Sequence, residues 1–115
     1  MSVGSVACFR LGMKPVESPV TTRLADGMAC RTPVPESVEV ILREADDVVT
    51  VTDDEVAQSM RILFSDTHNV AEGAGAAALA AALQQQERWR GKTVGVCLSG
   101  GNVDSGMFAG VLAAA

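Results

Sequence analysis

The sequence predicts an α/β fold in which a small parallel sheet is flanked by helices. Segments 46–52 and 93–99 are rich in valine and threonine, which favours neighbouring strands, and the second is apolar enough to be buried on both faces. Apolar residues at helical spacing precede, separate and follow these segments, and such alternation is typical of a parallel sheet. In a chain of 115 residues we expect a single partial domain over 1–115, with an irregular segment 1–36 and an α/β core 37–115.

The first half of the chain contains clear local signals. Four prolines fall within residues 1–36 and predict an irregular segment there. Apolar residues three and four positions apart predict a helix over 37–45. Thr52 and Glu55 have the spacing of a capping box, so we expect a helix to begin directly after the strand at 46–52.

The second half is dominated by small apolar residues. A helix is expected from Val70 to Gln86, and its centre is nearly all alanine, so it needs contacts on several sides. The strand at 93–99 follows, with Cys97 expected as a small core residue. A terminal helix is expected over 103–114.

Composition excludes several classes of function. The formal net charge is −5 and the basic residues are scattered, which disfavours a nucleic-acid partner. Three cysteines without paired spacing argue against a disulfide framework or a zinc site. The longest apolar stretch, 74–83, is too short to span a bilayer, and no signal peptide is visible at the N-terminus. We therefore expect a cytoplasmic protein without a membrane partner.

The strand predicted at 93–99 runs into the turn Ser99-Gly100-Gly101-Asn102. In open α/β sheets ligands bind at this edge, and glycine lets a ligand approach the backbone. Exposed amides at the next helix start favour an anion or a ring acceptor. The same residue types also serve simply to turn the chain and cap a helix, and spacing alone favours that alternative.

Two further glycine turns and one histidine are candidates of the same kind. Glu72 precedes Gly73 and Gly75 at the start of a helix, where a glutamate is commonly a partner of the helix dipole. Asp26-Gly27 by itself indicates only a turn. His68 is the only histidine and is expected in a solvated loop or as a helix cap.

The segments "ADGMA", "TDDEVAQSM", "EGAGAAALAAAL" and "VCLSGGNVD" together resemble the C-terminal portion of the serine/threonine dehydratases, also called threonine ammonia-lyases. These are pyridoxal-phosphate enzymes of fold type II, similar to tryptophan synthase β. The resemblance runs from about residue 10 onward, with the motifs in family order. It implies that Ser99, in the same turn as Gly100, hydrogen-bonds the pyridine nitrogen of the cofactor. It also implies that Glu72 lies beside the cofactor ring and that Gly27 lines the cofactor pocket.

Other family features are missing from this sequence. The family's Schiff-base lysine lies in a motif that neither Lys14 nor Lys92 matches, and the tetraglycine loop for the cofactor phosphate and the metal-binding segment are also absent. The chain resembles roughly the last third of such an enzyme. We therefore expect a truncated segment that has no catalytic residue or metal site, does not bind pyridoxal phosphate alone and is inactive alone.

Two alternatives remain open from the sequence. The chain could be a self-associating module, a homodimer formed through an exposed apolar helix or sheet surface. It could also be one chain of a split enzyme that a separate N-terminal polypeptide completes.

Overall fold

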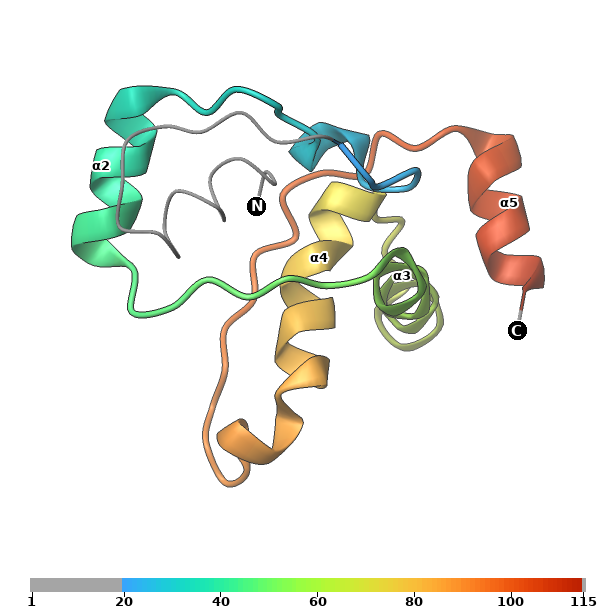
Figure 1. Ribbon diagram of the computed structural model, residues 1–115. Helices are drawn as coiled ribbons and strands as arrows, with labels where there is room; N and C mark the ends of the chain where they lie inside the picture. Colours follow the sequence, from blue (N-terminus) through green and yellow to red (C-terminus); the bar gives the residue numbers. More distant parts are fainter. Residues whose placement is uncertain (1–19, 115) are drawn as a thin grey trace. The chain divides into compact units, whose positions relative to one another are not determined.

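The computed structural model describes residues 20–114, and within this range the protein is helical, with no β-strand. The expected α/β fold with a small parallel sheet is therefore wrong, and so are the strands expected at 46–52 and 93–99. The elements in chain order are η1 (Asp26–Met28), α2 (Pro35–Glu44), α3 (Asp53–Thr67), α4 (Gly73–Gln84), η2 (Gln86–Trp89) and α5 (Ser105–Ala113) (Figure 1).

The two expected strands fail because a strand requires a hydrogen-bonded neighbour as well as a suitable composition. Residues 93–99 make no backbone hydrogen bond to any residue of the described range. In 46–52, the backbone N–H groups of Val48 and Thr52 donate to carboxylates of Asp47 and Glu55, each at 2.7 Å. The valines and threonines of 46–52 and 93–99 thus favour an extended backbone, but a strand also needs a neighbouring strand to hydrogen-bond with, and composition does not provide one.

The chain divides into two compact units. The first unit includes Gly27–Thr50 and contains α2, whose position agrees with the helix expected at 37–45. This helix begins with Pro35, whose fixed φ suits the first helical turn, and Glu36 follows as a favourable charge at the N-terminus. The second unit consists of Arg23–Asp26 and Val51–Ala115.

In the second unit, α3 begins and ends as its sequence predicts. The Thr52 side chain accepts a hydrogen bond from the Glu55 N–H at 3.2 Å, while Glu55 Oε2 accepts one from the Thr52 N–H at 2.7 Å. This reciprocal pair is the expected capping box. The helix ends at His68, an exposed residue with left-handed φ of 56°, so the prediction of a capping histidine is confirmed.

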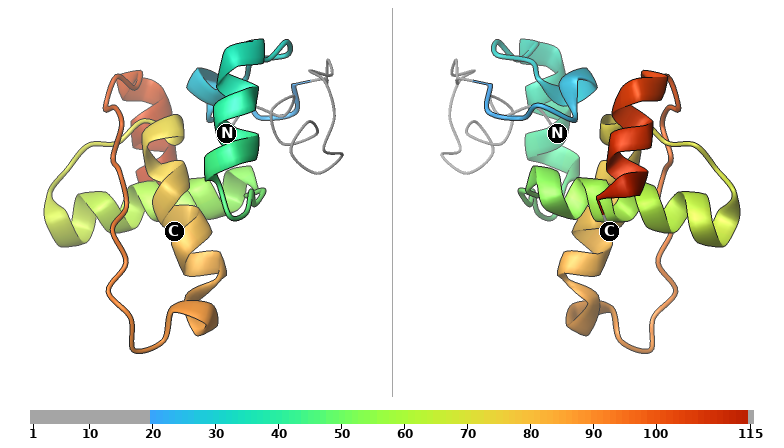
Figure 2. Two further views of the ribbon diagram at one scale, coloured as in Figure 1. Left: turned by 90° about the vertical axis from the view of Figure 1, so that its left-hand side faces the viewer. Right: turned by 90° about the vertical axis from the view of Figure 1, so that its right-hand side faces the viewer.

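Helix α4 packs across α3 through small side chains (Figures 1 and 2). Ala76, Ala77 and Ala80 of α4 are buried, as are Val56 and Met60 of α3, and alanine allows the two backbones to approach closely. The structure thus contains the helix expected from Val70 to Gln86, shortened to Gly73–Gln84 and followed by η2. Within residues 20–114, no helix has both the length and the apolar character needed to cross a membrane.

Helix α5 is held against α3 by two contacts. The rings of Phe64 and Phe108 meet edge to face, with centroids 5.5 Å apart. Arg61 donates from Nη1 to the carbonyl oxygen of Val111 at 3.0 Å. The Asp104 side chain caps the helix by accepting from the Met107 N–H at 3.0 Å.

Between η2 and α5 the chain returns, without regular structure, to the start of α4 (Figures 1 and 2). Every residue from Gly91 to Ser99 is exposed. Cys97 is among them, so its expected place in a core is wrong. The apolar character of this segment therefore does not produce burial within the described chain.

The start of α4 lies directly against the backbone of two other segments. A Cβ atom on Gly73 would lie 3.1 Å from the Cα of Ala25 and closer still to the carbonyl of Leu24. A Cβ atom on Gly75 would lie 3.0 Å from the backbone nitrogen of Gly100 and would collide with its carbonyl oxygen. Glycine at these two positions is therefore what permits the segments to meet.

We predict that Gly75→Ala destabilises the second unit. The added methyl group would have to displace the Gly100 backbone, and such overpacking costs about 1–3 kcal/mol. Gly110→Ala is the matched control, because no heavy atom lies within 4 Å of its added Cβ and alanine favours a helix by up to about 1 kcal/mol. Urea unfolding measures both free energies, and equal effects of the two substitutions would contradict the close contact.

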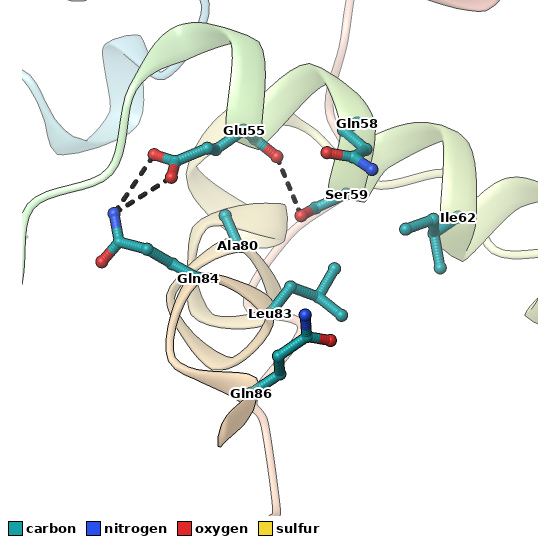
Figure 3. A pocket seen from close by; sticks show the side chains of 8 residues that line it. All are labelled: Glu55, Gln58, Ser59, Ile62, Ala80, Leu83, Gln84 and Gln86. Atoms are coloured by element: carbon teal, nitrogen blue, oxygen red, sulfur yellow. Dashed lines mark hydrogen bonds between the residues drawn. The ribbon is translucent and has the colours of Figure 1, made fainter. Parts of the chain in front are cut away.

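Glu55 makes the stability of the second unit depend on pH. The Thr52 backbone N–H, with further hydrogen bonds from the Gln84 amide and the Thr52 hydroxyl, holds the pKa of the Glu55 carboxyl below its ordinary value (Figure 3). A depressed pKa stabilises the folded state above about pH 4.3, where an unfolded glutamate is ionised, and this stabilisation disappears as the pH falls through the folded value.

We therefore predict that Glu55→Gln lowers the free energy of unfolding at pH 6 and that the deficit narrows toward pH 3. Glutamine can still accept from the Thr52 N–H, so the substitution removes the charge and leaves a capping partner. Urea unfolding across this pH range gives the comparison. Glu39→Gln, at an exposed carboxyl without a hydrogen bond in the described range, is the control, and the same narrowing in that variant would refute the role of Glu55.

Candidate functional site

The start of α4 and the turn at 99–102 form one assembled edge of the second unit. The backbone N–H of Glu72 donates to the carbonyl oxygen of Gly100 at 3.1 Å. The turn is further shaped by the Val103 N–H, which donates to the carbonyl of Gly101 at 3.0 Å. Two glycine turns that are 28 positions apart in the sequence (from 72 to 100) are thereby held together.

Glu72 occupies the N-cap position of α4, but its side chain makes no capping hydrogen bond. Its carboxylate lies against Gly100, where a Cβ atom would be 3.0 Å from the carboxyl carbon Cδ. The negative charge of Glu72 still lies at the positive end of the α4 helix dipole, which agrees with the expectation that this glutamate is a partner of the dipole. The side chain is half-buried, so part of it faces the site edge.

Ser99 is exposed directly before Gly100, and its hydroxyl has no hydrogen-bond partner among residues 20–114. A hydroxyl can donate one hydrogen bond and accept others. Ser99 precedes Gly100 in the chain, and the Glu72 carboxylate lies against the same glycine. The hydroxyl can serve as a neutral hydrogen-bond donor, whereas the carboxylate can only accept hydrogen bonds.

Gly27 is the fourth residue predicted for the site. It is exposed in the short helix η1 and belongs to the first unit, whereas Ser99, Glu72 and Gly100 belong to the second. The structure thus brings together three of the four predicted residues within one unit. The chain reaches Gly27 from Ala25, which is buried and lies against Gly73 of α4.

No lysine of the described range reaches this edge. Lys92 lies at the other end of the extended segment, with its ammonium 5.8 Å from the ring centre of Trp89. An extended chain rises roughly 3.3 Å per residue, which puts Lys92 on the order of 20 Å along the chain from Ser99. Lys14 lies outside the described residues.

A concave feature between α3 and α4 is lined by none of the predicted site residues. It is a cavity of about 240 Å³. Figure 3 shows the side chains that line it: Glu55, Gln58, Ser59, Ile62, Ala80, Leu83, Gln84 and Gln86. The Glu55 carboxylate of this cavity accepts hydrogen bonds from the Thr52 backbone N–H and from the Gln84 amide. It therefore links α3 to α4 and is not free to bind a ligand.

Sequence reasoning did not identify the glutamines of this cavity, because a single polar residue on a helix carries no signal of its own. It did identify the glycines at the start of α4, but not that Gly75 contacts Gly100. The spacing of Gly73 and Gly75 was the available signal for a close backbone approach.

Residues 2–100 match the family model described as pyridoxal-phosphate dependent enzyme. The chain is 44% identical over 92 residues to the L-threonine ammonia-lyase of Geobacter sulfurreducens, which covers 79% of this chain and 23% of that protein. It is 38% identical over 85 residues to the L-threonine ammonia-lyase of Thermotoga maritima, covering 74% of this chain and 21% of that protein. The chain thus spans under a quarter of the length of these two curated relatives.

Solved structures agree with these matches. The crystal structure of a threonine deaminase from T.th. superimposes with a TM-score of 0.77 at 30% identity, over 89% of this chain and 37% of that one. Maize serine racemase superimposes with a TM-score of 0.77 at 27% identity, over 97% of this chain and 37% of the racemase. The sequence match and the shared backbone lead to one conclusion: the chain belongs to the family of pyridoxal-phosphate dependent enzymes.

Proposed function

We propose that this chain forms one wall of the cofactor site of a threonine or serine dehydratase and that it has no such activity alone. The observation that carries the proposal is the hydrogen bond from the Glu72 N–H to the Gly100 carbonyl, 3.1 Å long. It joins the two turns whose side chains are suited to the cofactor ring. The names of the relatives, which are threonine ammonia-lyases and dehydratases, support the substrate class.

The three residues of the assembled edge have distinct parts in this proposal. The Ser99 hydroxyl donates to the ring nitrogen, and the neutral donor leaves that nitrogen uncharged. Glu72 borders the ring, and Gly100 lets the ring approach the backbone because it has no side chain. Gly27 is assigned to the pocket by the family resemblance alone, since it belongs to the first unit. When bound, pyridoxal phosphate supplies the electron sink that makes loss of a β-hydroxyl group from an amino acid feasible.

The wall lacks two parts that this chemistry needs. A lysine must bind the cofactor covalently and move the α-proton, and Lys92 is directed to Trp89 instead. A glycine-rich loop must hold the phosphate, and the sequence contains no run of glycines longer than the pair at 100–101. We propose that both parts come from a polypeptide portion outside residues 1–115, either in the same protein or in a separate chain.

We predict that the purified 115-residue chain, mixed with pyridoxal phosphate and L-threonine, releases no 2-oxobutyrate above the cofactor-only background. The reason is that Lys92, the lysine of the described residues, lies over Trp89, and that Lys14 does not stand in the family's lysine motif. The Thermotoga maritima L-threonine ammonia-lyase serves as the positive control. Production of keto acid at an enzyme-like rate, abolished by Lys92→Ala, would overturn this prediction.

A chimera tests the proposed role of Ser99. Residues 20–114 of this chain replace the corresponding segment of the Geobacter sulfurreducens L-threonine ammonia-lyase, and cofactor affinity and activity are measured. We predict that the chimera is active and that Ser99→Ala weakens cofactor binding about tenfold, the worth of one good hydrogen bond. Ser105→Ala, also at an exposed serine, is the control and should have no effect. Equal cofactor affinity in the Ser99→Ala and parent chimeras would exclude the assigned contact.

A further inference from the structure

The first turn of α4 lies between two backbone segments that are far apart in the sequence. A Cβ atom on Gly73 would collide with the backbone of segment 23–26, and one on Gly75 would collide with that of the turn 99–102. Each residue of a helix turns by about 100°, so residues two positions apart point in nearly opposite directions. The two segments therefore contact opposite sides of the start of α4.

The segment 23–26 is itself fixed to the start of α3. The backbone N–H of Arg23 donates to Oδ2 of Asp53 at 2.8 Å, across 30 positions of the sequence. Ala25 of this segment is 5% exposed, and its Cα would lie 3.1 Å from a Cβ atom on Gly73. Both contacts lie within the second unit. Asp53 thus anchors one of the two segments that hold the first turn of α4.

Glu72 lies at the point where these contacts meet. It is the N-cap residue of α4, but its side chain makes no capping hydrogen bond, so the helix end itself does not orient the carboxylate. Its backbone N–H donates to the Gly100 carbonyl, and its carboxylate lies against the same glycine. A shift of the α4 start relative to the turn 99–102 would therefore change the place of the Glu72 carboxylate.

We propose that Asp53 is a positioning residue for the cofactor site: by anchoring the segment 23–26, it holds the start of α4 against the turn 99–102 and so sets the place of Glu72. This inference rests on the proposed function, in which Glu72 borders the cofactor ring. Asp53 acts through the backbone of its neighbours and not by contact with the cofactor.

Asp54 provides a matched control for Asp53. Both aspartates lie in the first turn of α3, where a negative charge is favourable. Asp54 is exposed, and its carboxylate has no hydrogen bond within residues 20–114. Replacing either residue by alanine removes one first-turn charge, but only Asp53→Ala removes the acceptor for the Arg23 N–H. A difference between the two variants therefore measures the anchor and not the helix dipole.

Hydrogen exchange, followed by NMR in the 115-residue chain, tests the anchor without any cofactor. We expect Asp53→Ala to speed exchange of the Arg23 amide about tenfold, the worth of one hydrogen bond to a charged acceptor, and Asp54→Ala to leave it unchanged. Asp53→Asn should restore most of the protection, because its side-chain oxygen still accepts. An unprotected Arg23 amide in the parent chain, or equal exchange in the two alanine variants, would overturn the proposal.

The chimera that carries residues 20–114 of this chain tests the consequence at the site. We expect Asp53→Ala to weaken cofactor binding about threefold to tenfold and Asp54→Ala to leave the affinity of the parent chimera unchanged. In a Glu72→Gln background the effect of Asp53→Ala should shrink, because residues that act through one another are coupled in a double-mutant cycle. Additive effects of the two substitutions would indicate a merely structural role and refute the proposal.

The positioning role and the proposed function fail separately. Loss of the Asp53 effect on cofactor affinity, with the Ser99→Ala effect retained, would overturn the positioning role alone. Parent affinity in Ser99→Ala, with the Asp53 effect and its coupling to Glu72 retained, would contradict the contact assigned to Ser99 and support the positioning role. A parent chimera that binds no cofactor would contradict the proposed function, and exchange of the Arg23 amide would still decide whether Asp53 anchors the segment.

Discussion

The hydrogen bond between the Glu72 N–H and the Gly100 carbonyl is the contact on which the candidate site depends. It requires the start of α4 to approach the 99–102 turn at backbone distance, and Gly75 and Gly100 allow this because neither carries a side chain. The same constraint places the Glu72 carboxylate beside Gly100 and leaves Ser99 exposed at the edge. The close packing at Gly75 and Gly100 therefore also produces the arrangement of Glu72 and Ser99 that is proposed for cofactor binding.

The packing behind this edge comes from small residues and a few polar contacts. Alanines of α4 lie against α3, and the Glu55 carboxylate serves both the cap of α3 and the Gln84 amide of α4. Edge-to-face packing of Phe64 and Phe108 then joins α5 to α3. Because these contacts link all three helices, the turns at the start of α4 and before α5 rest on a shared support.

The extended segment 93–99 leads into the candidate site. Its Ser99 end borders the proposed cofactor wall, and all of its residues are exposed within the described range. The chain superimposes well on threonine deaminase but covers only 37% of that structure.

The sequence by itself determined what depends on neighbouring residues. The capping box of Thr52 and Glu55 and the cap at His68 follow from hydrogen bonds within a few positions, and the family motifs identified the candidate turns. Only the tertiary structure decided the rest. It showed that 93–99 has no partner strand within residues 20–114, that Cys97 is exposed, and that Gly100 meets α4. Composition can favour an extended backbone, but pairing and burial depend on segments distant in the chain, and no local pattern encodes which of them come together.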